Sequence, residues 1–463
     1  MTTGQSQPPA APSVTPFARA GRFRVVSWNV DGLERLCTTA AYQGNSLKTI
    51  ADRCDADIVC IQETKMRKRD KQGRDVPLPA RFSAADGYCV VASTAAYPNP
   101  ANPLEGLWGV TVCTKKDSVV PIKAETGLAW SKRNSSLRDP DRIGHYPDLD
   151  ALEIRVAELN TVEGEGRIVV LDCNVFVLIS VYMPNLTMFE AGKRRDAARL
   201  ADVLRSVLQA RVEHLKAAGR EVLVVGDFDT HVGYVEACKK PGQRWFAEMV
   251  SPTGCDLVDV LKSLHGGTGS GYTYFSGEQN KSRNLGTRID LALATRGLMK
   301  WIKGAGTYDD WTGSDHLPIY VDLHESIGDP ETGHVDLWPA LNPHRSSPAH
   351  EVRLPQLACE LEQQVRSQIP FQKFFQSPGR AAFSSTDDGV GTSSGRSGPS
   401  DSRSQSSGQV ATGKRSAPAS STASIPGGSG RPKHAEVLDL TESEPESKGQ
   451  GPIAESAKKQ RVA

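Results

Sequence analysis

Five short acidic segments recur along the chain, and each closes a run of apolar, β-branched residues. They are residues 27–31 (SWNVD), 61–65 (IQETK), 225–229 (VGDFD), 288–290 (RID) and 314–316 (SDH). A buried strand that ends in a carboxylate carries negative charge to the rim of its sheet. Several such rims together would form an oxygen-rich cage that suits a small, hard divalent cation. A phosphate held by that cation is the simplest substrate this pattern suggests.

The elements that must position these segments are visible as short apolar runs. We expect strands at residues 24–28, 58–61, 90–93, 109–114, 167–171, 175–182, 221–225, 289–294 and 319–323. Helices are expected at 46–53 and 193–218, and Gly219 follows the second where a helix end favours glycine. This alternation predicts an α/β (α+β) fold, a four-layered sandwich of two packed mixed β-sheets flanked by helices. The strand ends would converge on one rim.

Composition divides the chain into three parts. Residues 1–21 are rich in Pro, Ala and Thr and are expected to form a flexible arm. Residues 22–325 contain the apolar runs and are expected to form the catalytic domain. Residues 326–463 are expected to be a largely disordered tail, with one short helix at 362–373. Within it, residues 377–433 are mostly Ser, Gly, Pro, Thr and Arg, which cannot bury enough apolar surface to offset the ordering entropy.

Charge and cysteine content narrow the class of protein. The formal net charge is +1, so nucleic-acid binding would have to come from local basic patches. The cysteines number nine and include no Cys-x-x-Cys pair, and we expect no secretory leader, which favours free thiols in a reducing compartment. No cysteine follows Cys359, so a cysteine-ligated zinc module is not expected in the tail. No apolar run has the length of a membrane span.

Each acidic segment alone also has a structural explanation: Asn29 could cap a turn, and Glu63 could be a surface residue. The set is more specific, because the segments come in a fixed order with typical flanks. Those flanked segments are 27–33 (SWNVDGL), 62–65 (QETK), 181–185 (VYMPN), 226–229 (GDFD), 284–290 (NLGTRID) and 314–318 (SDHLP). Over residues 23–325 the chain resembles the endonuclease/exonuclease/phosphatase superfamily, and within it the exonuclease III branch of apurinic/apyrimidinic (AP) endonucleases.

This resemblance implies a phosphodiesterase centre that uses Mg²⁺, with Mn²⁺ as a second candidate. The cation would be held by side chains drawn from Asn29, Glu63, Asp227, Asp229, Asp315 and His316. Asp227 would position the attacking water, and His316, oriented by Asp290, would contact the scissile phosphate. Tyr182 would donate toward the phosphate or the leaving oxygen. Asp31, Lys65 and Arg288 would complete the site.

Asp229 departs from the family pattern, which usually has asparagine two residues after the catalytic aspartate. An ionised carboxylate only accepts hydrogen bonds, so Asp229 cannot donate to the phosphate as an amide does. Losing one such donor costs about 10²–10³ in rate. Asp229 could instead add a metal ligand. A catalytically weak protein that acts as a scaffold therefore stays open as an alternative.

The aromatic residues near the fourth segment favour abasic sites and 3′ ends of DNA as substrates. Residues 285–290 resemble the loop that lines an abasic pocket, and Tyr274 and Phe275 could pack on a baseless sugar. The alternative is that both rings are ordinary core aromatics. Thr287 stands where the major AP endonucleases have a bulky aromatic, which favours the AP endonuclease 2 subfamily. The activities implied are AP endonuclease, 3′–5′ exonuclease and 3′-phosphodiesterase in base excision repair.

Basic segments could supply the grip on DNA. Arg194 and Arg195 follow one of the motif segments, and residues 65–71 contain several more cations that could contact phosphates. Solvated surface charge is the alternative for both groups.

Another phosphoesterase of the superfamily, acting on a phosphoinositide or a nucleotide, is the alternative for the chain as a whole.

Motifs in the tail predict protein partners and location. Gln368, Phe371, Phe374 and Phe375 match the Q-x-x-h-x-x-F-F pattern of ligands of the sliding clamp PCNA. Residues 437–441 (VLDLT), followed by acids, resemble a SUMO-interacting motif, which would add a strand to a partner's sheet; an apolar patch without function is the alternative. Basic patches at 414–415 and 458–461 favour the nucleus. The arginines and the lack of acids near the start of the chain leave a mitochondrial pool open.

Overall fold

The structure, a computed structural model, describes residues 21–39, 42, 46–66, 78–95, 108–131, 134–185, 194–230, 240–266, 271–330, 333–345 and 353–367. These residues all belong to one unit of the chain, Met1–Ala381. Residues 1–20 of the expected arm, and everything from residue 368 onward, lie outside the described residues. The predicted disorder of the tail therefore stays a prediction.

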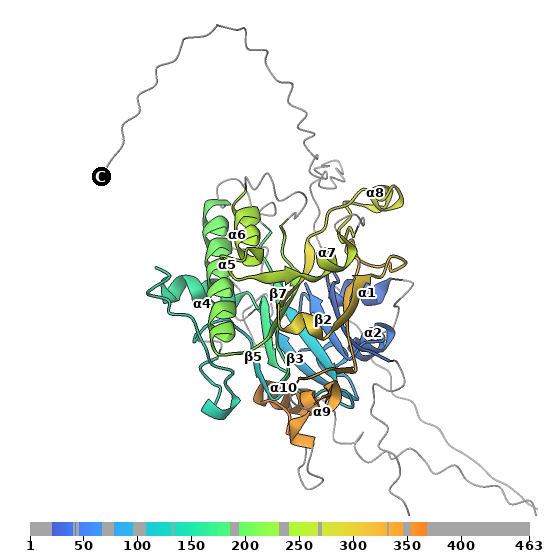
Figure 1. Cartoon of the computed structure of the whole chain (residues 1–463). Coiled ribbons are helices and arrows are strands. Elements are labelled where there is room, and N and C mark those ends of the chain that lie inside the picture. The colour runs from blue at the N-terminus through green and yellow to red at the C-terminus, as the bar shows by residue number, and fades with distance from the viewer. Residues whose placement is uncertain are drawn as a thin grey trace, which may run out of the picture. The chain divides into compact units, whose positions relative to one another are not determined.

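Two six-stranded sheets form the centre of the described unit (Figure 1). The first has the order β11-β12-β1-β2-β4-β3 and consists of β1 (Phe23–Asn29), β2 (Ile58–Gln62), β3 (Tyr88–Ser93), β4 (Val110–Lys115), β11 (Ile302–Thr307) and β12 (Ile319–Leu323). The second has the order β5-β6-β7-β8-β10-β9 and consists of β5 (Lys123–Glu125), β6 (Ile168–Asp172), β7 (Val177–Tyr182), β8 (Val222–Asp227), β9 (Leu257–Asp259) and β10 (Asp290–Thr295). Both sheets are mixed, because β1 is parallel to β2 and β7 to β8, while the other neighbours are antiparallel.

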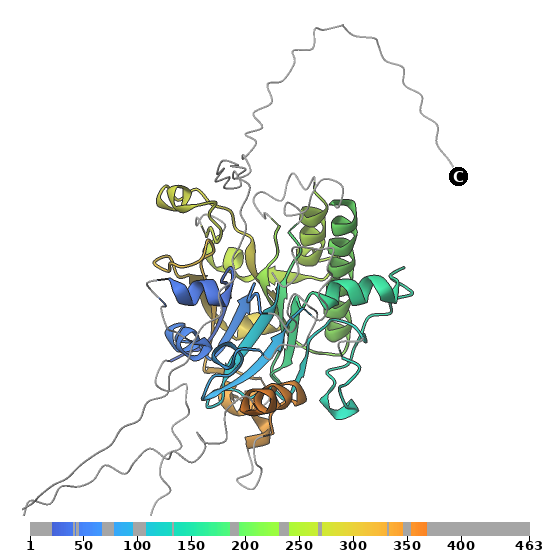
Figure 2. The same ribbon diagram turned by 180° about the vertical axis from the view of Figure 1, so that it is seen from behind.

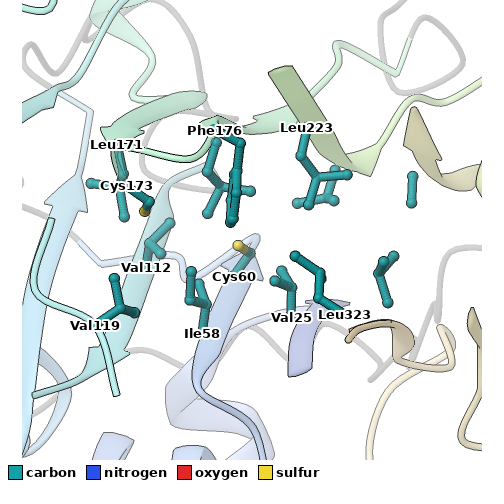
Figure 3. Packing of buried hydrophobic residues seen from close by; sticks show 14 of the residues in the cluster. Val25, Ile58, Cys60, Val112, Val119, Leu171, Cys173, Phe176, Leu223 and Leu323 are labelled. Carbon is teal, nitrogen blue, oxygen red and sulfur yellow. The ribbon is translucent and has the colours of Figure 1, made fainter. Parts of the chain in front are cut away.

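The inner faces of the two sheets pack against each other. In Figure 3, Val25, Ile58, Cys60 and Val112 from the first sheet face Leu171 and Leu223 from the second, together with Phe176 just before β7. All of these residues are at most 1% exposed. Strands buried on both faces need continuous apolar runs rather than alternation, which explains the β-branched runs in the sequence.

Helices cover the outer faces of both sheets and complete four layers (Figures 1 and 2). On the first sheet, α1 (Leu33–Thr38), α2 (Leu47–Arg53) and α3 (Ala80–Ser83) pack over the outward residues of β1 and β2. On the second, α4 (Val156–Gly164), α5 (Arg194–Ala217) and α6 (Pro241–Val250) pack over β7 and β8. The predicted fold class, a four-layered α/β sandwich, is confirmed.

The two helices expected from periodicity are present close to their predicted bounds. In α2, the Ser46 side chain accepts a hydrogen bond from the backbone of Thr49 and caps the helix. In α5, the apolar residues from Val203 to Leu215 join the core against the second sheet. Gly219 follows with a φ of 74°, a conformation that glycine adopts without strain. No described helix has both the length and the apolar character needed to cross a bilayer.

The part of the chain that packs on the sandwich continues past residue 325, where composition placed the boundary. It contains the small hairpin β13 (Ser326–Ile327) and β14 (Val335–Asp336), then α9 (Leu337–Leu341) and α10 (Gln356–Ser367). Leu337, Leu341 and Ala358 join the core between the sheets. Helix α10 begins six residues before the helix expected at 362–373. These elements are short and polar on one side, so average composition hides them.

Most of the remaining short helices lie in loops that connect strands, and the last of them follows α9. They are α7 (Val260–His265), α8 (Glu278–Ser282) and 3-10 turns at Asp139–Asp141, Leu298–Lys300 and Pro343–Arg345. Among them, α7 and α8 flank the chain segments that enter β10. They therefore border the rim at which the acidic segments end.

Candidate active site and metal centre

Strand register brings four of the predicted residues to one rim. Asn29 and Gln62 are partners at the ends of the parallel strands β1 and β2. Tyr182 and Asp227 are partners at the ends of β7 and β8, and Asp290 begins β10 opposite Asp227. Because the two sheets pack face to face, these ends meet across the sandwich.

Gln62 ties the two sheets together directly beneath this rim. It is fully buried and donates to Ser180 on β7 at 3.1 Å and to Ser27 on β1 at 3.0 Å. A buried amide with both partners fixed positions the following residue, Glu63, at the edge of the interface. Sequence reasoning did not assign Gln62 a role.

The loops that follow the strands hold their acidic residues in an uncommon backbone conformation. Asp31, Glu63, Lys65 and Asp229 have φ values of 49°, 50°, 53° and 43°. Non-glycine residues rarely occupy this region, and they persist there only where the surroundings fix them, often at functional sites. Three of the five acidic segments, 27–31, 61–65 and 225–229, therefore share a strained geometry as well as a position.

Gly109 is one of the groups that fix this geometry. It has a φ of 120°, and its carbonyl accepts the backbone N–H of Thr64 at 3.1 Å, while Trp108 accepts that of Lys65 at 3.0 Å. A Cβ on residue 109 would lie 2.4 Å from Oγ1 of Thr64. Only glycine fits there, and it holds the turn that presents Glu63.

Asn29 lies at the centre of the predicted metal-binding residues. Its side chain is buried, and Nδ2 donates to Glu63 at 3.2 Å and to Asp227 at 2.9 Å. Its Oδ1 accepts the backbone N–H of Asp31 at 3.0 Å. The hydroxyl of Tyr182 also donates to Glu63. Asn29, Glu63, Tyr182 and Asp227 thus form one connected network.

His316 and Asp290 form a buried pair beside this network. His316 Nδ1 lies 2.8 Å from Asp290 Oδ2, and Nε2 lies 3.8 Å from Asp227 Oδ2. Burial opposes the charged imidazolium, but Asp290, and then Asp227 and Asp315, raise the pKa of His316 to about 10. Burial, with Asp290 adding and His316 opposing, raises the pKa of Asp227 to about 7. The geometry therefore favours a cationic His316 held between two carboxylates.

Two residues to which the sequence analysis assigned no role fix this pair. The hydroxyl of Thr273 accepts the backbone N–H groups of Ile289 at 3.1 Å and Asp290 at 3.0 Å. The hydroxyl of Ser314 donates to the Asn29 carbonyl at 2.7 Å and accepts the backbone N–H of His316 at 3.1 Å. The spacing of Ser314 and His316 is that of a local Ser turn, which is a signal available in the sequence.

The donor set fits a hard divalent cation. Among the residues that the structure describes, Asp227, Asp290 and His316 place one possible ligand atom each within 4.8 Å of the others. A hard divalent cation prefers oxygen donors, so the carboxylates of Glu63, Asp227 and Asp315 are better donors than the His316 imidazole. Burial raises the pKa of Asp315, with Asp31 and Glu63 adding and His316 opposing. A cation among these oxygens would relieve that repulsion.

Lys65 and Asp31 form a charge cluster at the edge of the site. The ammonium of Lys65 bonds to Asp31 and lies 3.0 Å from Glu63 Oε2. Arg35, which the sequence did not flag, also pairs with Asp31 at 2.7 Å and reaches the Gly313 carbonyl at 3.2 Å. Asp31 is therefore neutralised by two cations, which leaves Glu63 as the stronger candidate ligand.

Arg288 is in the acidic network, where it pairs with a carboxylate. Both terminal nitrogens bond to Asp259, at 3.0 and 2.8 Å, and Asp259 caps α7 by accepting from Lys262. This bidentate pair anchors the chain that enters β10 to the neighbouring helix. Arg288 thus supports the position of Asp290.

The two predicted DNA-contacting aromatics differ in their placement. Tyr274 makes isolated bridges to Thr287 and to His316, and its ring centroid lies 5.0 Å from that of His316. Phe275 is only 4% exposed and packs edge-on against Tyr272, as the core-aromatic alternative expected. Tyr274 is therefore the ring that borders the site.

Several predicted residues lie where the structure gives no side-chain account. Arg194 and Arg195 begin α5, but their side chains lie outside the described residues, as do most of the basic residues in 65–71. The clamp motif (Gln368, Phe371, Phe374 and Phe375) and residues 437–441 are also outside them.

Asp229 donates its backbone N–H to Asp227 Oδ1 at 2.9 Å, at the edge of the network.

Two packed mixed sheets with a cluster of buried carboxylates at their strand ends define a phosphoesterase-type α/β sandwich. The chain belongs to the Endonuclease/Exonuclease/phosphatase family, whose model matches residues 26–316. Nucleases of this family use a divalent metal ion, and the buried carboxylate cluster here has the donors for one.

The chain is similar to proteins named DNA-(apurinic or apyrimidinic site) endonuclease 2. It is 28% identical to the one from Schizosaccharomyces pombe over 328 residues, which is 65% of this chain and 58% of the relative. It is 29% identical to that of Mus musculus over 341 residues, or 66% and 60% of the two chains. The chain thus spans about three fifths of the length of the curated relatives it matches.

A solved structure confirms the fold. The crystal structure of the catalytic domain of Xenopus laevis APE2 superposes with a TM-score of 0.52 and 24% sequence identity, covering 65% of this chain and 92% of that chain.

Proposed function

We propose that this chain is a DNA-repair nuclease that hydrolyses phosphodiester bonds at abasic sites and 3′ ends, as AP endonuclease, 3′–5′ exonuclease and 3′-phosphodiesterase in base excision repair. One observation carries the proposal: Asn29, Glu63, Tyr182, Asp227 and His316 meet in a single network although they come from both sheets. Mg²⁺ is the proposed cation, with Mn²⁺ as a substitute, because the donors are carboxylate oxygens. When bound, the cation polarises the phosphate and neutralises developing charge.

The position of each side chain indicates its role in the proposed reaction. Asp227 is buried and has a raised pKa, so it can accept a proton from a water that attacks the phosphate. His316, held cationic by Asp290, can donate toward a phosphate oxygen, where negative charge grows. Tyr182 donates its one hydroxyl proton to Glu63 and orients it, so it can donate to the leaving oxygen only when that bond is released. Asn29 fixes the separation of Glu63 and Asp227.

Substrate choice is proposed from the rim residues and the relatives. Tyr274 lies beside His316 and bridges Thr287, so a baseless sugar could pack against this ring when its phosphate sits at His316. The relatives in S. pombe and Mus musculus are named for AP sites. Both observations favour a damaged nucleotide over a soluble phosphate ester.

The proposal extends to partners and location. The clamp motif at 368–375 would bind PCNA and place the nuclease at newly made 3′ ends. Residues 437–441 would bind SUMO, and the basic patches of the tail would direct the protein to the nucleus, with a mitochondrial pool as a second location. Pull-down of purified clamp by the parent, but not by Phe374→Ala/Phe375→Ala, would support the clamp assignment. Equal capture of the clamp by both proteins would rule out the clamp assignment.

A gel assay tests the catalytic proposal. Parent and Glu63→Ala proteins are incubated with Mg²⁺ and duplexes carrying one abasic site or a blocked 3′ end, beside a panel of inositol phosphates and nucleotides. We expect cleavage of the DNA by the parent alone. Turnover confined to the soluble esters would assign a different phosphoesterase. No product from either protein would favour a clamp-recruited scaffold, the reading that Asp229 keeps open.

A further inference from the structure

Arg167 is a fully buried cation behind the candidate site. Its side chain is 0% exposed, and its guanidinium carbon lies 4.1 Å from the ring centroid of Trp108 and 4.8 Å from that of Tyr182. Its Nε donates to Glu165, and Nη1 donates to the backbone carbonyl of Tyr182 at 3.2 Å. The backbone N–H of Tyr182 in turn donates to the Arg167 carbonyl at 3.0 Å. One residue therefore fixes both the ring and the main chain of Tyr182.

The two residues whose rings contact Arg167 are both linked to the Glu63 loop. The backbone carbonyl of Trp108 accepts the backbone N–H of Lys65, two residues from Glu63, and the Tyr182 hydroxyl donates to the Glu63 carboxylate. These contacts form a closed circuit. The loop of Glu63 bonds to Trp108, the Trp108 ring contacts Arg167, Arg167 contacts Tyr182, and Tyr182 bonds to Glu63. Glu63 has a φ of 50°, which persists only where neighbours fix it. The circuit supplies that constraint.

We propose that Arg167 is a positioning residue that sets the placement of Tyr182 and Glu63 for the cation and the scissile phosphate. This inference rests on the proposed function and deepens it, because it names a residue that acts through the site without touching substrate. Partners one shell behind metal ligands typically change metal affinity or activity about 10–100-fold when removed. Lysine cannot replace arginine fully, since only the planar guanidinium stacks between two rings while donating in two directions.

Stability alone is the competing explanation for a buried cation between aromatic rings, and the chain offers a matched control. Arg211 is also 0% exposed, lies 4.5 Å from the ring centroid of Tyr146 and bonds to the buried Glu125 at 2.8 Å. It belongs to α5 and to the core outside the second sheet, and neither Tyr146 nor Glu125 belongs to the site. Removing either arginine should destabilise the fold, but only Arg167 should affect the site.

The experiment measures Mn²⁺ affinity by electron paramagnetic resonance, thermal unfolding, and kcat and KM on abasic duplex. It compares the full chain with Arg167→Met, Arg167→Lys and Arg211→Met. For Arg167→Met we expect Mn²⁺ binding to weaken about 10–100-fold, kcat to fall and KM for DNA to stay within about threefold. Arg167→Lys should recover part of both losses. Arg211→Met should lower the melting temperature and leave Mn²⁺ affinity and kcat per folded molecule unchanged.

Parent-like Mn²⁺ affinity in Arg167→Met would overturn the inference, and so would an equal loss in Arg211→Met, because destabilisation would then explain both. If Arg167→Met does not fold, Arg167→Lys decides: a folded protein with weaker Mn²⁺ binding supports the role, and unchanged binding overturns it. A parent that binds Mn²⁺ but cuts no DNA would defeat the proposed function, while the comparison of affinities would still test Arg167.

Discussion

The substitution Asp290→Asn should lower the pKa of His316 and slow cleavage. His316 has its pKa raised from 6.5 to about 10. That difference corresponds to about 5 kcal/mol between the two protonation states. Asp290 is the foremost of the raising groups, at 2.8 Å from Nδ1, with Asp227 and Asp315 next. Replacing its charge with a neutral amide should therefore lower the pKa of His316 by at least about one unit, or about 1.4 kcal/mol.

The sign of the pH effect follows from the charged form. A raised pKa keeps His316 cationic across the neutral range, so in the parent this charge is lost only as the pH rises through about 10. In Asp290→Asn it should be lost at lower pH, and activity that needs the cation should decline earlier on the alkaline side. Loss of the orienting carboxylate should also reduce kcat even at the pH optimum.

Histidine-resolved NMR measures this directly. The chain has ten histidines, so His316→Gln identifies the resonance, and its titration is compared in parent and Asp290→Asn. Asp172→Asn is the matched control, because Asp172 is a buried carboxylate that pairs with Arg220 at the opposite end of the second sheet. An unchanged titration of His316 in Asp290→Asn, or an equal shift in Asp172→Asn, would refute the reasoning.

Four further results are expected. Asp229→Asn should raise the single-turnover rate in Mg²⁺, by up to about 10²-fold, because an amide can donate to the phosphate; a slower variant would show that Asp229 is adapted to this site. Gly109→Ala should weaken Mn²⁺ binding, since its Cβ would meet Thr64 and the strain costs on the order of 1–3 kcal/mol; parent-like binding would contradict this. The kcat/KM should fall as the pH drops through about 7, where Asp227 gains its proton; a limb near pH 4 would argue against Asp227 as the base. Glu125→Gln should cost about 3–5 kcal/mol in urea unfolding, because it leaves the buried charge of Arg211 unpaired; a loss below about 1 kcal/mol would argue against the pair's role.

The sequence predicted the sandwich and the residues at strand ends because these leave local signals. Asn29, Glu63, Asp227 and Asp290 each close an apolar run, and strand register then determines where they meet. His316 was found through its motif. For these residues, knowledge of the neighbouring ten positions was enough.

What the sequence could not give was long-range pairing. Arg167 and Gln62 act through residues more than a hundred positions away or on another sheet, and no local pattern marks those contacts. Arg288 was predicted in the site, but its charge alone did not reveal its partner, which is Asp259.

Local patterns also failed where elements are short. Tyr274 lies in isolated bridges and Phe275 in no strand, so alternation could not show which ring faces the site. Helix α10 and the hairpin after residue 325 gain their stability by packing on the sandwich, which composition does not report.

The account depends on Glu63 and His316 lying in one cation-holding pocket, and Mn²⁺ tests this most directly. Added to the parent at one equivalent, Mn²⁺ should selectively broaden the NMR signal of the His316 imidazole through its paramagnetism, and Glu63→Ala should abolish that broadening. Broadening of other histidines in place of His316, or the same broadening in Glu63→Ala, would contradict the account.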